Sequence, residues 1–298
     1  MASVVRREAR PHSRAPFAWI LVASLLFATM STLVKTASSS VSLPEIVFFR
    51  TLPAAIGLFA LARFRGDRIG SEHWRLHALR GVVGVTGTFV SFYAVSHLPL
   101  ATATTLEYTT PLFLLAFVLV AARHQFTRQM ALAIVGGFAG VIVLLRPSLQ
   151  AGEALAFCAA LGSGAVAAIA YALIRRLGEV GEPAWRIVLW YSVAGASVSA
   201  ALIPFGAISR YTTATIVVLA CVGVVGAFAQ LALTRAFSTG PTTSLASLQY
   251  STVAFAAIYG VVLWGDTFSA ASALGLSVIV ASCILALRRV RKPVQLDG

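Results

Sequence analysis

The feature that most constrains this chain is a series of apolar segments, each about as long as the roughly 20 residues that cross a bilayer as a helix. Short polar breaks separate them and leave no room for a soluble domain. With 58% hydrophobic and 11% charged residues, the chain also has too little polar surface for a water-soluble globule. We therefore predict an all-α polytopic membrane protein with ten transmembrane helices. The segments are 16–36, 44–62, 78–96, 100–121, 129–146, 152–174, 184–204, 212–236, 241–263 and 268–287.

The positive charge of the chain, +13 overall, lies mainly in the breaks between these segments and at the two ends. No long basic face is interleaved with aromatic residues, so we exclude a nucleic-acid partner. If the N-terminus is inside, only Lys35, Arg146 and Arg210 fall outside. Arg50 lies within a segment, and every other Lys and Arg, including Arg80, falls inside. By the positive-inside rule, the N-terminal tail 1–15 and the C-terminal tail 289–298 are both cytoplasmic. The predicted location is the cell membrane, inner or plasma.

An internal repeat appears when the chain is displaced by 142 residues. The most compact match sets Leu106-Glu107-Tyr108-Thr109-Thr110 against Leu248-Gln249-Tyr250-Ser251-Thr252, and Gly and Pro positions agree at the same offset. This divides the chain into two five-helix halves, 16–147 and 148–288. Because five is odd, the second half enters the membrane in the opposite sense, as in transporters whose central site opens alternately to each face.

Two stretches carry a resemblance to a known family. They are Pro44 to Arg50, with the sequence PEIVFFR, and residues 106–111, with the sequence LEYTTP. With ten segments in two halves, the chain resembles the drug/metabolite transporter superfamily, and within it the EamA type, from about residue 16 to 288. The resemblance implies two EamA-like repeats that transport a small metabolite. It is closest to amino-acid exporters of the YddG kind, which implies export of aromatic or other neutral amino acids. Export of drugs or other metabolites is the alternative.

Few polar groups lie inside the segments, and such groups mark functional sites because a charge at mid-span costs about 2.5 to 3.5 kcal/mol on insertion scales. Glu107 lies about two helical turns into the fourth segment. Three roles are open to it: a proton carrier, a contact for a substrate amine, or a structural partner of Arg50 or Arg235. Proton coupling and facilitated diffusion are therefore equally reasonable. Gln249 holds the equivalent position in the second half.

Tyr108 and Tyr250 are related by the repeat and lie beside Glu107 and Gln249, where a ring face and a hydroxyl are both available to a substrate. We give Arg50, which matches an arginine of the family's second helix, a structural role. The predicted substrate-binding residues are Glu107, Tyr108, Gln249 and Tyr250, followed by the weaker candidates Tyr93, Gln230, Tyr171 and Trp190.

Small residues recur at spacings of three and four in two segments, a pattern that favours close helix approach. They are Gly81, Gly84 and Gly87 in the third segment, and Gly136, Gly137 and Gly140 in the fifth.

An intramembrane enzyme and a channel are the rival classes. Ser163, in Leu161-Gly162-Ser163-Gly164, suggests a serine nucleophile, but no histidine lies at depth to act as its base. A channel would show rings of charge or carbonyls around a pore. We therefore expect no enzymatic activity, no catalytic residue, no metal and no cofactor. The expected partners are a small-molecule substrate and the lipid bilayer, with the chain a monomer or a weak homo-oligomer.

Overall fold

The computed structural model describes residues 15–38, 40–98, 105–121, 127–145, 154–203, 211–264 and 270–288. Within these ranges the secondary structure is entirely helical, as predicted. By length and composition, α1, α2, α7 and α9 are apolar enough to cross a membrane, and α6 and α12 contain shorter apolar stretches. The helices are α1 (Ala15–Ala37), α2 (Leu43–Arg65), α3 (Trp74–His97), α5 (Thr110–Ala121), α6 (Arg128–Leu145), α7 (Ala154–Glu179), α8 (Ala184–Leu202), α9 (Thr213–Thr239), α10 (Thr242–Leu248), α11 (Ser251–Trp264) and α12 (Ala270–Arg288).

The fourth and ninth predicted segments are interrupted helices rather than continuous ones. In the fourth segment, residues 105–107 are helical, Tyr108 and Thr109 form a turn, and α5 begins at Thr110. In the ninth, α10 ends at Leu248 and α11 begins only after the turn at Gln249 and Tyr250. The two interruptions fall on the stretches that match each other in the internal repeat.

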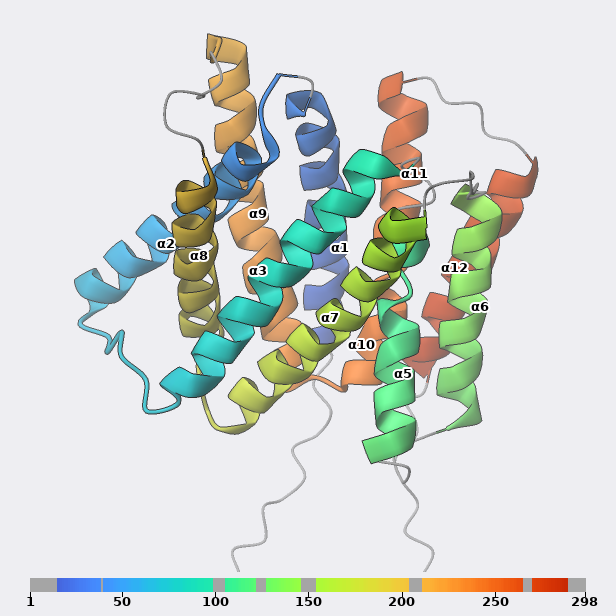
Figure 1. Ribbon diagram of the computed structural model, residues 1–298. Helices are drawn as coiled ribbons and strands as arrows, with labels where there is room; N and C mark the ends of the chain where they lie inside the picture. The colour runs from blue at the N-terminus through green and yellow to red at the C-terminus, as the bar shows by residue number, and fades with distance from the viewer. Residues whose placement is uncertain are drawn as a thin grey trace, which may run out of the picture.

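Helices of the two halves pack on each other in a regular scheme (Figure 1). Helix α1 packs along α9, and α7 packs along α3. These two contacts are the same contact with the halves exchanged, since each pairs the first helix of one half with the third helix of the other. Helices α2 and α8 pack together on one side of the bundle, and α6 and α12 on the other. These pairs also join corresponding helices of the two halves.

Glycines bring the helix backbones close together, as their spacing predicted. A Cβ atom added at Gly140 in α6 would lie 2.9 Å from the Gly275 carbonyl oxygen in α12. In the same way, a Cβ atom at Gly81 in α3 would lie 3.2 Å from the Ala194 side chain in α8. Side chains larger than hydrogen would force these helix pairs apart.

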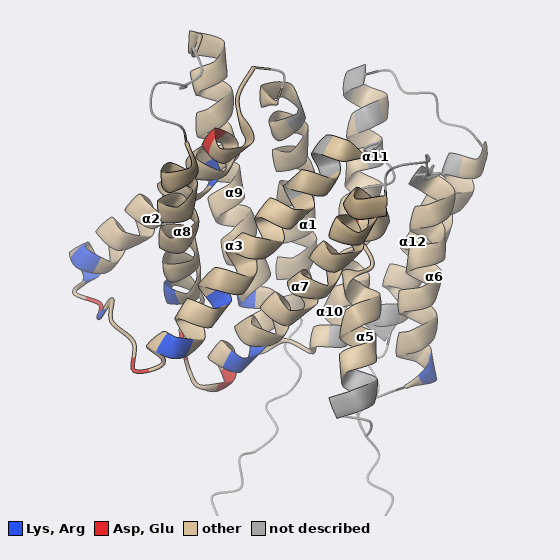
Figure 2. Ribbon diagram, in the orientation of Figure 1, with Lys and Arg blue, Asp and Glu red and all other residues tan. Residues whose placement is uncertain are grey.

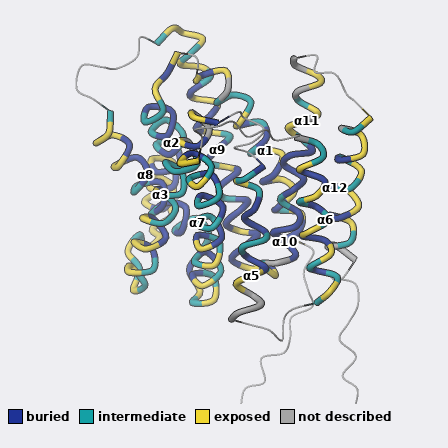
Figure 3. Tube along the Cα trace, turned by 45° about the vertical axis from the view of Figure 1, so that its right-hand side comes forward, coloured by how far each residue is buried: buried dark blue, intermediate teal, exposed yellow. Residues whose placement is uncertain are grey.

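The outer surface of the bundle is rich in exposed apolar side chains, while burial concentrates where the helices face one another (Figure 3). Phe64, Leu155 and Val262 are among the exposed ones. In a lipid environment these side chains require no polar cover. Lys and Arg gather toward one end of the bundle, the lower edge of Figure 2, where α2 and α7 end and α3 and α6 begin. Helix α1 begins and α12 ends toward this same end (Figure 1).

Candidate functional site

The two helix interruptions lie against α7 in the interior of the bundle. The Gln249 amide, from the second interruption, donates a hydrogen bond to the Tyr171 hydroxyl of α7 over 3.0 Å. At the first interruption, the Leu106 carbonyl oxygen would lie 3.3 Å from a Cβ atom added at Gly164 of α7. The Tyr108 and Tyr250 rings, one from each interruption, have centroids 6.5 Å apart. The fold therefore brings together the two stretches that the repeat relates.

Glu107 lies among α2, α3 and α7. The Ser91 hydroxyl of α3 is within hydrogen-bonding range of its carboxylate, and Arg50 of α2 interacts with it electrostatically. Tyr171 of α7 also lies within its electrostatic reach. The Glu107 side chain is nevertheless exposed. The neighbours of this carboxylate come from three different helices of the bundle.

Of the two cations proposed as partners for Glu107, only Arg50 lies near it. The Arg235 guanidinium lies over the Trp19 ring, 5.0 Å from its centroid, and the residue is exposed. Arg50 also interacts electrostatically with Tyr171 and with Tyr191 of α8. Its position beside both Glu107 and these phenols is compatible with the structural role predicted for it.

Arg80 is a member of this region that the sequence reasoning missed. Its guanidinium lies over the Tyr191 ring, 4.5 Å from the centroid, and the residue is only 4% exposed. Its Nε and Nη1 atoms have no hydrogen-bond partner in the described structure. Arg80 falls near the edge of an apolar segment, and for that reason the positive-inside rule predicts that it is one of the cytoplasmic charges. The signal for burial was Gly84, which stands one helical turn later and leaves room for the guanidinium.

The remaining predicted site residues divide into two groups. Tyr171 forms a cluster with Glu107, Arg50, Arg80 and Gln249, which we call the central cluster. Its ring also stacks on Phe237 with centroids 4.6 Å apart. Tyr250 touches this cluster but is 0% exposed, packs against Gly137 of α6, and has a hydroxyl without a hydrogen-bond partner in the described residues. In this conformation its surroundings are those of a core residue, and a lining role for it remains a prediction.

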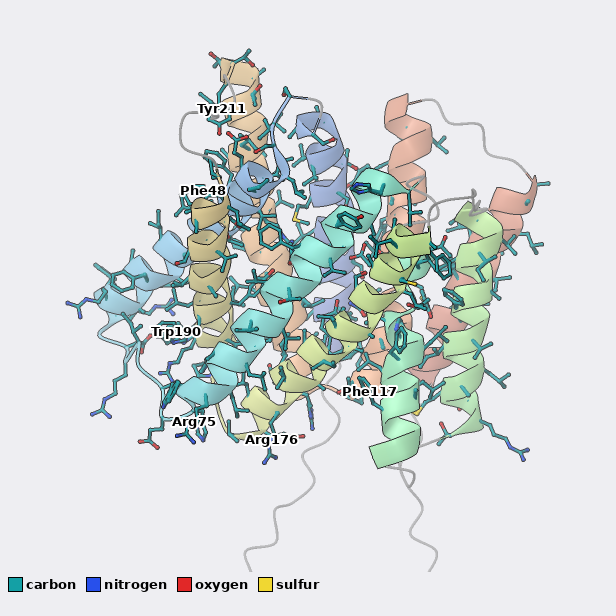
Figure 4. All side chains as sticks on the ribbon, in the orientation of Figure 1. Phe48, Arg75, Phe117, Arg176, Trp190 and Tyr211 are labelled. Atoms are coloured by element: carbon teal, nitrogen blue, oxygen red, sulfur yellow. The ribbon has the colours of Figure 1, made fainter. Side chains whose placement is uncertain are left out.

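Tyr93, Gln230 and Trp190 make contacts with residues outside the cluster. The Tyr93 ring lies 4.2 Å from the ring of His97, near the end of α3. Gln230 is buried in α9, and its amide donates to the Thr234 hydroxyl at 3.5 Å. Trp190 donates from its indole nitrogen to the Ile69 carbonyl oxygen at 3.2 Å, at the lower left of Figure 4. None of these contacts joins them to Glu107 or Gln249.

Ser163, the residue that suggested an enzyme, is buried in α7 and donates its hydroxyl hydrogen bond to the Ala160 carbonyl oxygen at 2.7 Å. This is the local bond by which a helical serine satisfies itself against its own backbone. Among the described residues, no group of three or more His, Cys, Asp or Glu side chains is placed to hold a metal ion.

A polar contact ties the two halves together at the upper end of the bundle. Glu45, in the first turn of α2, accepts a hydrogen bond from the Tyr211 hydroxyl at 2.6 Å. It also accepts one from the Ser42 backbone nitrogen at 2.9 Å, which completes a capping box. Tyr211 lies just before α9, at the top of Figure 4. We call the Glu45–Tyr211 contact the upper tether.

A second contact group lies at the opposite end. Glu182, just before α8, accepts hydrogen bonds from the Ser71 hydroxyl and from Arg186 Nη1, the latter at 3.0 Å. His77 Nε2 lies 3.3 Å from the same carboxylate. Burial alone would raise the pKa of Glu182, but these contacts together lower it to about 2. We call the Ser71–Glu182 contact the lower tether. Each tether joins the start of the second helix of one half to the segment before the third helix of the other half.

Comparison with known proteins identifies similar chains over nearly the full length. Residues 15–146 and 154–288 each match the model of the EamA-like transporter family. The pseudopaline exporter CntI of Pseudomonas aeruginosa is 29% identical over 272 residues, covering 91% of this chain and 95% of that protein. The S-adenosylmethionine uptake transporter of Rickettsia bellii is 23% identical, covering 92% and 94%. Human solute carrier family 35 member G1 is 24% identical, covering 89% and 76%.

A solved structure also superimposes on this fold. Its TM-score is 0.80, and the match covers 94% of this chain and all of that one at 20% sequence identity. At this identity the likeness establishes the fold alone.

Proposed function

Because the chain belongs to the EamA-like transporter family, we propose that it carries a small metabolite across the cell membrane by alternating access, and that it exports amino acids, aromatic or other neutral. The family and the named relatives make it a membrane transporter. One relative is named as an exporter and another as an uptake transporter, so the direction of transport belongs to the proposal. The resemblance to amino-acid exporters of the YddG kind supports the choice of substrate.

The proposed architecture is ten spans in two inverted five-helix repeats, 16–147 and 148–288, with both chain ends in the cytoplasm. Its support is the symmetric exchange of helix contacts, in which α1 meets α9 as α7 meets α3. The family model also matches each half separately. The gathering of Lys and Arg at the end of the bundle where α1 begins and α12 ends supports the orientation.

The observation that carries the proposal is the meeting of two interrupted helices beside a cluster of polar side chains that includes Glu107, Tyr171 and Gln249. Backbone at membrane depth leaves the helical conformation only where protein or a water-filled path satisfies its polar groups. In carriers with inverted repeats, such interruptions mark the substrate site. Here Glu107 stands beside one interruption and Gln249 within the other, with Tyr171 between them.

In the proposed site, each of these side chains has a different role in binding the substrate. Glu107 attracts a substrate amine, Tyr108 and Tyr171 present ring faces, and Gln249 offers an amide held in place by its bond to Tyr171. Rocking of one half against the other then exposes the site to each face in turn. The upper and lower tethers lie at opposite ends of the bundle, where such a motion makes and breaks contacts.

Counterflow in proteoliposomes tests the substrate class. Vesicles loaded with unlabelled phenylalanine or leucine should accumulate the labelled amino acid, whereas vesicles loaded with nucleosides or sugars should not. Glu107→Gln should reduce this exchange and alter its pH dependence. Exchange that saturates with a cationic drug but not with any amino acid would replace amino-acid export by the drug-export alternative. Fluxes at ion-channel rates would contradict a carrier altogether.

A further inference from the structure

We propose that Arg80 binds a carboxylate of the transported molecule, so that the substrates of this carrier are small molecules with an anionic group. This proposal rests on the proposed function, because it places Arg80 in the transport site. It goes further in naming the chemical group that the site selects and the residue that selects it.

The first reason is that Arg80 is buried without a matching acceptor. The residue is 4% exposed, and its Nε and Nη1 donors have no hydrogen-bond partner in the described structure. Buried donors are satisfied in the great majority of native structures, and those that are not require an explanation. A guanidinium with two unsatisfied donors is especially costly inside a membrane protein. A planar carboxylate is the group whose geometry a guanidinium matches best.

The second reason is that the fold holds the guanidinium in a defined place. It lies on the Tyr191 ring, and the Tyr191 hydroxyl is within 3.3 Å of the Thr88 hydroxyl. A Cβ atom at Gly84 would overlap the guanidinium and lie 2.9 Å from Tyr191 Cε2. Gly84 therefore supplies the space into which Arg80 folds. Positioning of this kind lowers the entropy lost when a ligand binds.

The third reason is that Arg80 belongs to the same cluster as Glu107 and Gln249. Tyr171, which accepts the hydrogen bond from Gln249, interacts electrostatically with Glu107, Arg80 and Arg50. Among the described residues, Arg50 interacts electrostatically with Glu107, whereas the groups that act on Arg80 are Tyr191, Tyr171 and Arg50, none of which is a carboxylate. An anionic substrate group supplies the missing negative charge.

The internal repeat shows that this charge arrangement is confined to one half. At the displacement of 142 residues, Val222 corresponds to Arg80 and Gln249 corresponds to Glu107. Val222 is fully buried in α9. The charged candidates for contact with a substrate's amine and carboxylate, Glu107 and Arg80, therefore both lie in the first half, and uncharged side chains hold the equivalent positions of the second. In a carrier, a group that is buried in one conformation becomes accessible when the halves move.

Four phenyl compounds distinguish recognition of a carboxylate from recognition of an amine in a binding experiment on the purified full-length protein. Phenylalanine carries both charges, phenylalaninamide lacks the carboxylate, 3-phenylpropionate lacks the amine, and phenethylamine carries the amine alone. Their affinities are measured by ligand-dependent thermal stabilisation in detergent, and labelled phenylalanine exchange is measured in proteoliposomes. The variants are Arg80→Gln and Gly84→Ala, which removes room for the guanidinium but keeps its charge. Arg235→Gln is the control, because Arg235 also stacks on an aromatic ring but is exposed.

We expect wild type to bind phenylalanine and 3-phenylpropionate more tightly than the two compounds without a carboxylate. Arg80→Gln should weaken binding of both carboxylates by about 10-fold to 100-fold, the usual effect of losing a hydrogen-bonded charge, and change phenylalaninamide by less than about 2-fold. Gly84→Ala should weaken the same two ligands, and Arg235→Gln should weaken none. A purely structural Arg80 would instead reduce binding of all ligands together.

The outcomes separate this proposal from the proposed function. If wild type binds the carboxylates through Arg80 but exchanges no amino acid, the anion site stands and amino-acid transport fails. If wild type exchanges phenylalanine and Arg80→Gln leaves the preference for phenylalanine over phenylalaninamide unchanged, transport stands and the role of Arg80 is wrong. Absence of carboxylate binding in wild type, or a uniform loss for all four ligands in Arg80→Gln, also overturns it.

Discussion

Two tyrosines near the helix interruptions show that the surroundings of a hydroxyl group decide whether it takes part in a hydrogen bond. The Tyr171 hydroxyl accepts a hydrogen bond from Gln249, whereas the Tyr250 hydroxyl is buried without a partner in the described residues. The sequence placed both in the predicted site. The structure distinguishes them by what surrounds each ring, since Tyr250 fills the space that Gly137 leaves in α6.

Removing these hydroxyls one at a time should have unequal effects. Tyr171→Phe leaves the Gln249 amide without its partner and should cost about 1 kcal/mol in substrate binding, the usual net value of a hydrogen bond. Tyr250→Phe should leave binding unchanged and should not lower thermal stability, since it removes an unsatisfied polar atom. Dissociation constants for phenylalanine and melting temperatures in detergent measure both effects. Equal losses in the two variants would contradict the distinction.

The lower tether gives the fold a predictable response to acid. Because the pKa of Glu182 is lowered to about 2 from the ordinary value of 4.5, its contribution to stability is complete above about pH 4.5 and is lost as the pH falls toward 2. Between about pH 5 and 3, wild type should therefore lose more thermal stability than Glu182→Gln, which lacks the titrating group. Glu179→Gln is the control, since Glu179 pairs with Arg175 at the surface. Parallel curves for wild type and Glu182→Gln would contradict this role.

At the scale of helices, the internal repeat identified the two stretches, but it did not show that the helices are interrupted there. The match between residues 106–110 and 248–252 selected both stretches, but neither contains a glycine or proline that would break a helix. Pro111, at the second position of α5, was the available signal in the first half, because proline favours the start of a helix. Val253 takes its place in the second half. There, the Ser251 hydroxyl donates a hydrogen bond to the Leu248 carbonyl oxygen at 2.6 Å, as the Thr109 hydroxyl does to that of Leu106 in the first half, and such local bonds compete with helical ones.

The close packing of α6 on α12 leads to a prediction about the stability of the folded protein. Gly140→Ala would place a methyl group 2.9 Å from the Gly275 carbonyl oxygen and should destabilise the protein by about 1–3 kcal/mol, as overpacking does. Gly57→Ala in α2 is the matched control, because nothing lies within 4 Å of a Cβ atom there. Its effect should stay within about 0.5 kcal/mol. Melting temperatures of the two variants in detergent make the comparison, and a loss in Gly57→Ala equal to that in Gly140→Ala would contradict it.

For the whole molecule, the sequence predicted the helical class and the division into matching halves, but not the contacts at the two ends of the bundle. Glu45 and Tyr211 are 166 residues apart, and Ser71 and Glu182 are 111 apart. No local pattern relates such distant residues. The three-dimensional fold pairs them because each half places its second helix beside the third helix of the other, where α2 packs on α9 and α8 on α3.

If the two halves rock as proposed, breaking one tether should favour opening at its own end. Tyr211→Phe removes the hydrogen bond to Glu45, and Ser71→Ala removes one of those to Glu182. A reporter cysteine at Ser91, beside Glu107, in a chain whose native Cys158, Cys221 and Cys283 are replaced, measures access to the site. An impermeant thiol reagent should label it faster from the outer face in Tyr211→Phe and faster from the cytoplasmic face in Ser71→Ala.

Two controls lie at the same ends without joining the halves: Thr215→Ala, which loses a contact with Thr212, the N-cap residue of α9, and Glu179→Gln, which loses a contact within α7. Neither should change the side from which labelling is faster. A shift of the conformational equilibrium by about 1.4 kcal/mol changes the ratio of populations about tenfold, so loss of a single hydrogen bond is enough to change the labelling ratio severalfold. If both tether variants accelerate labelling from the same face, the two ends do not open in alternation, and rocking about the central site is the wrong motion for this carrier.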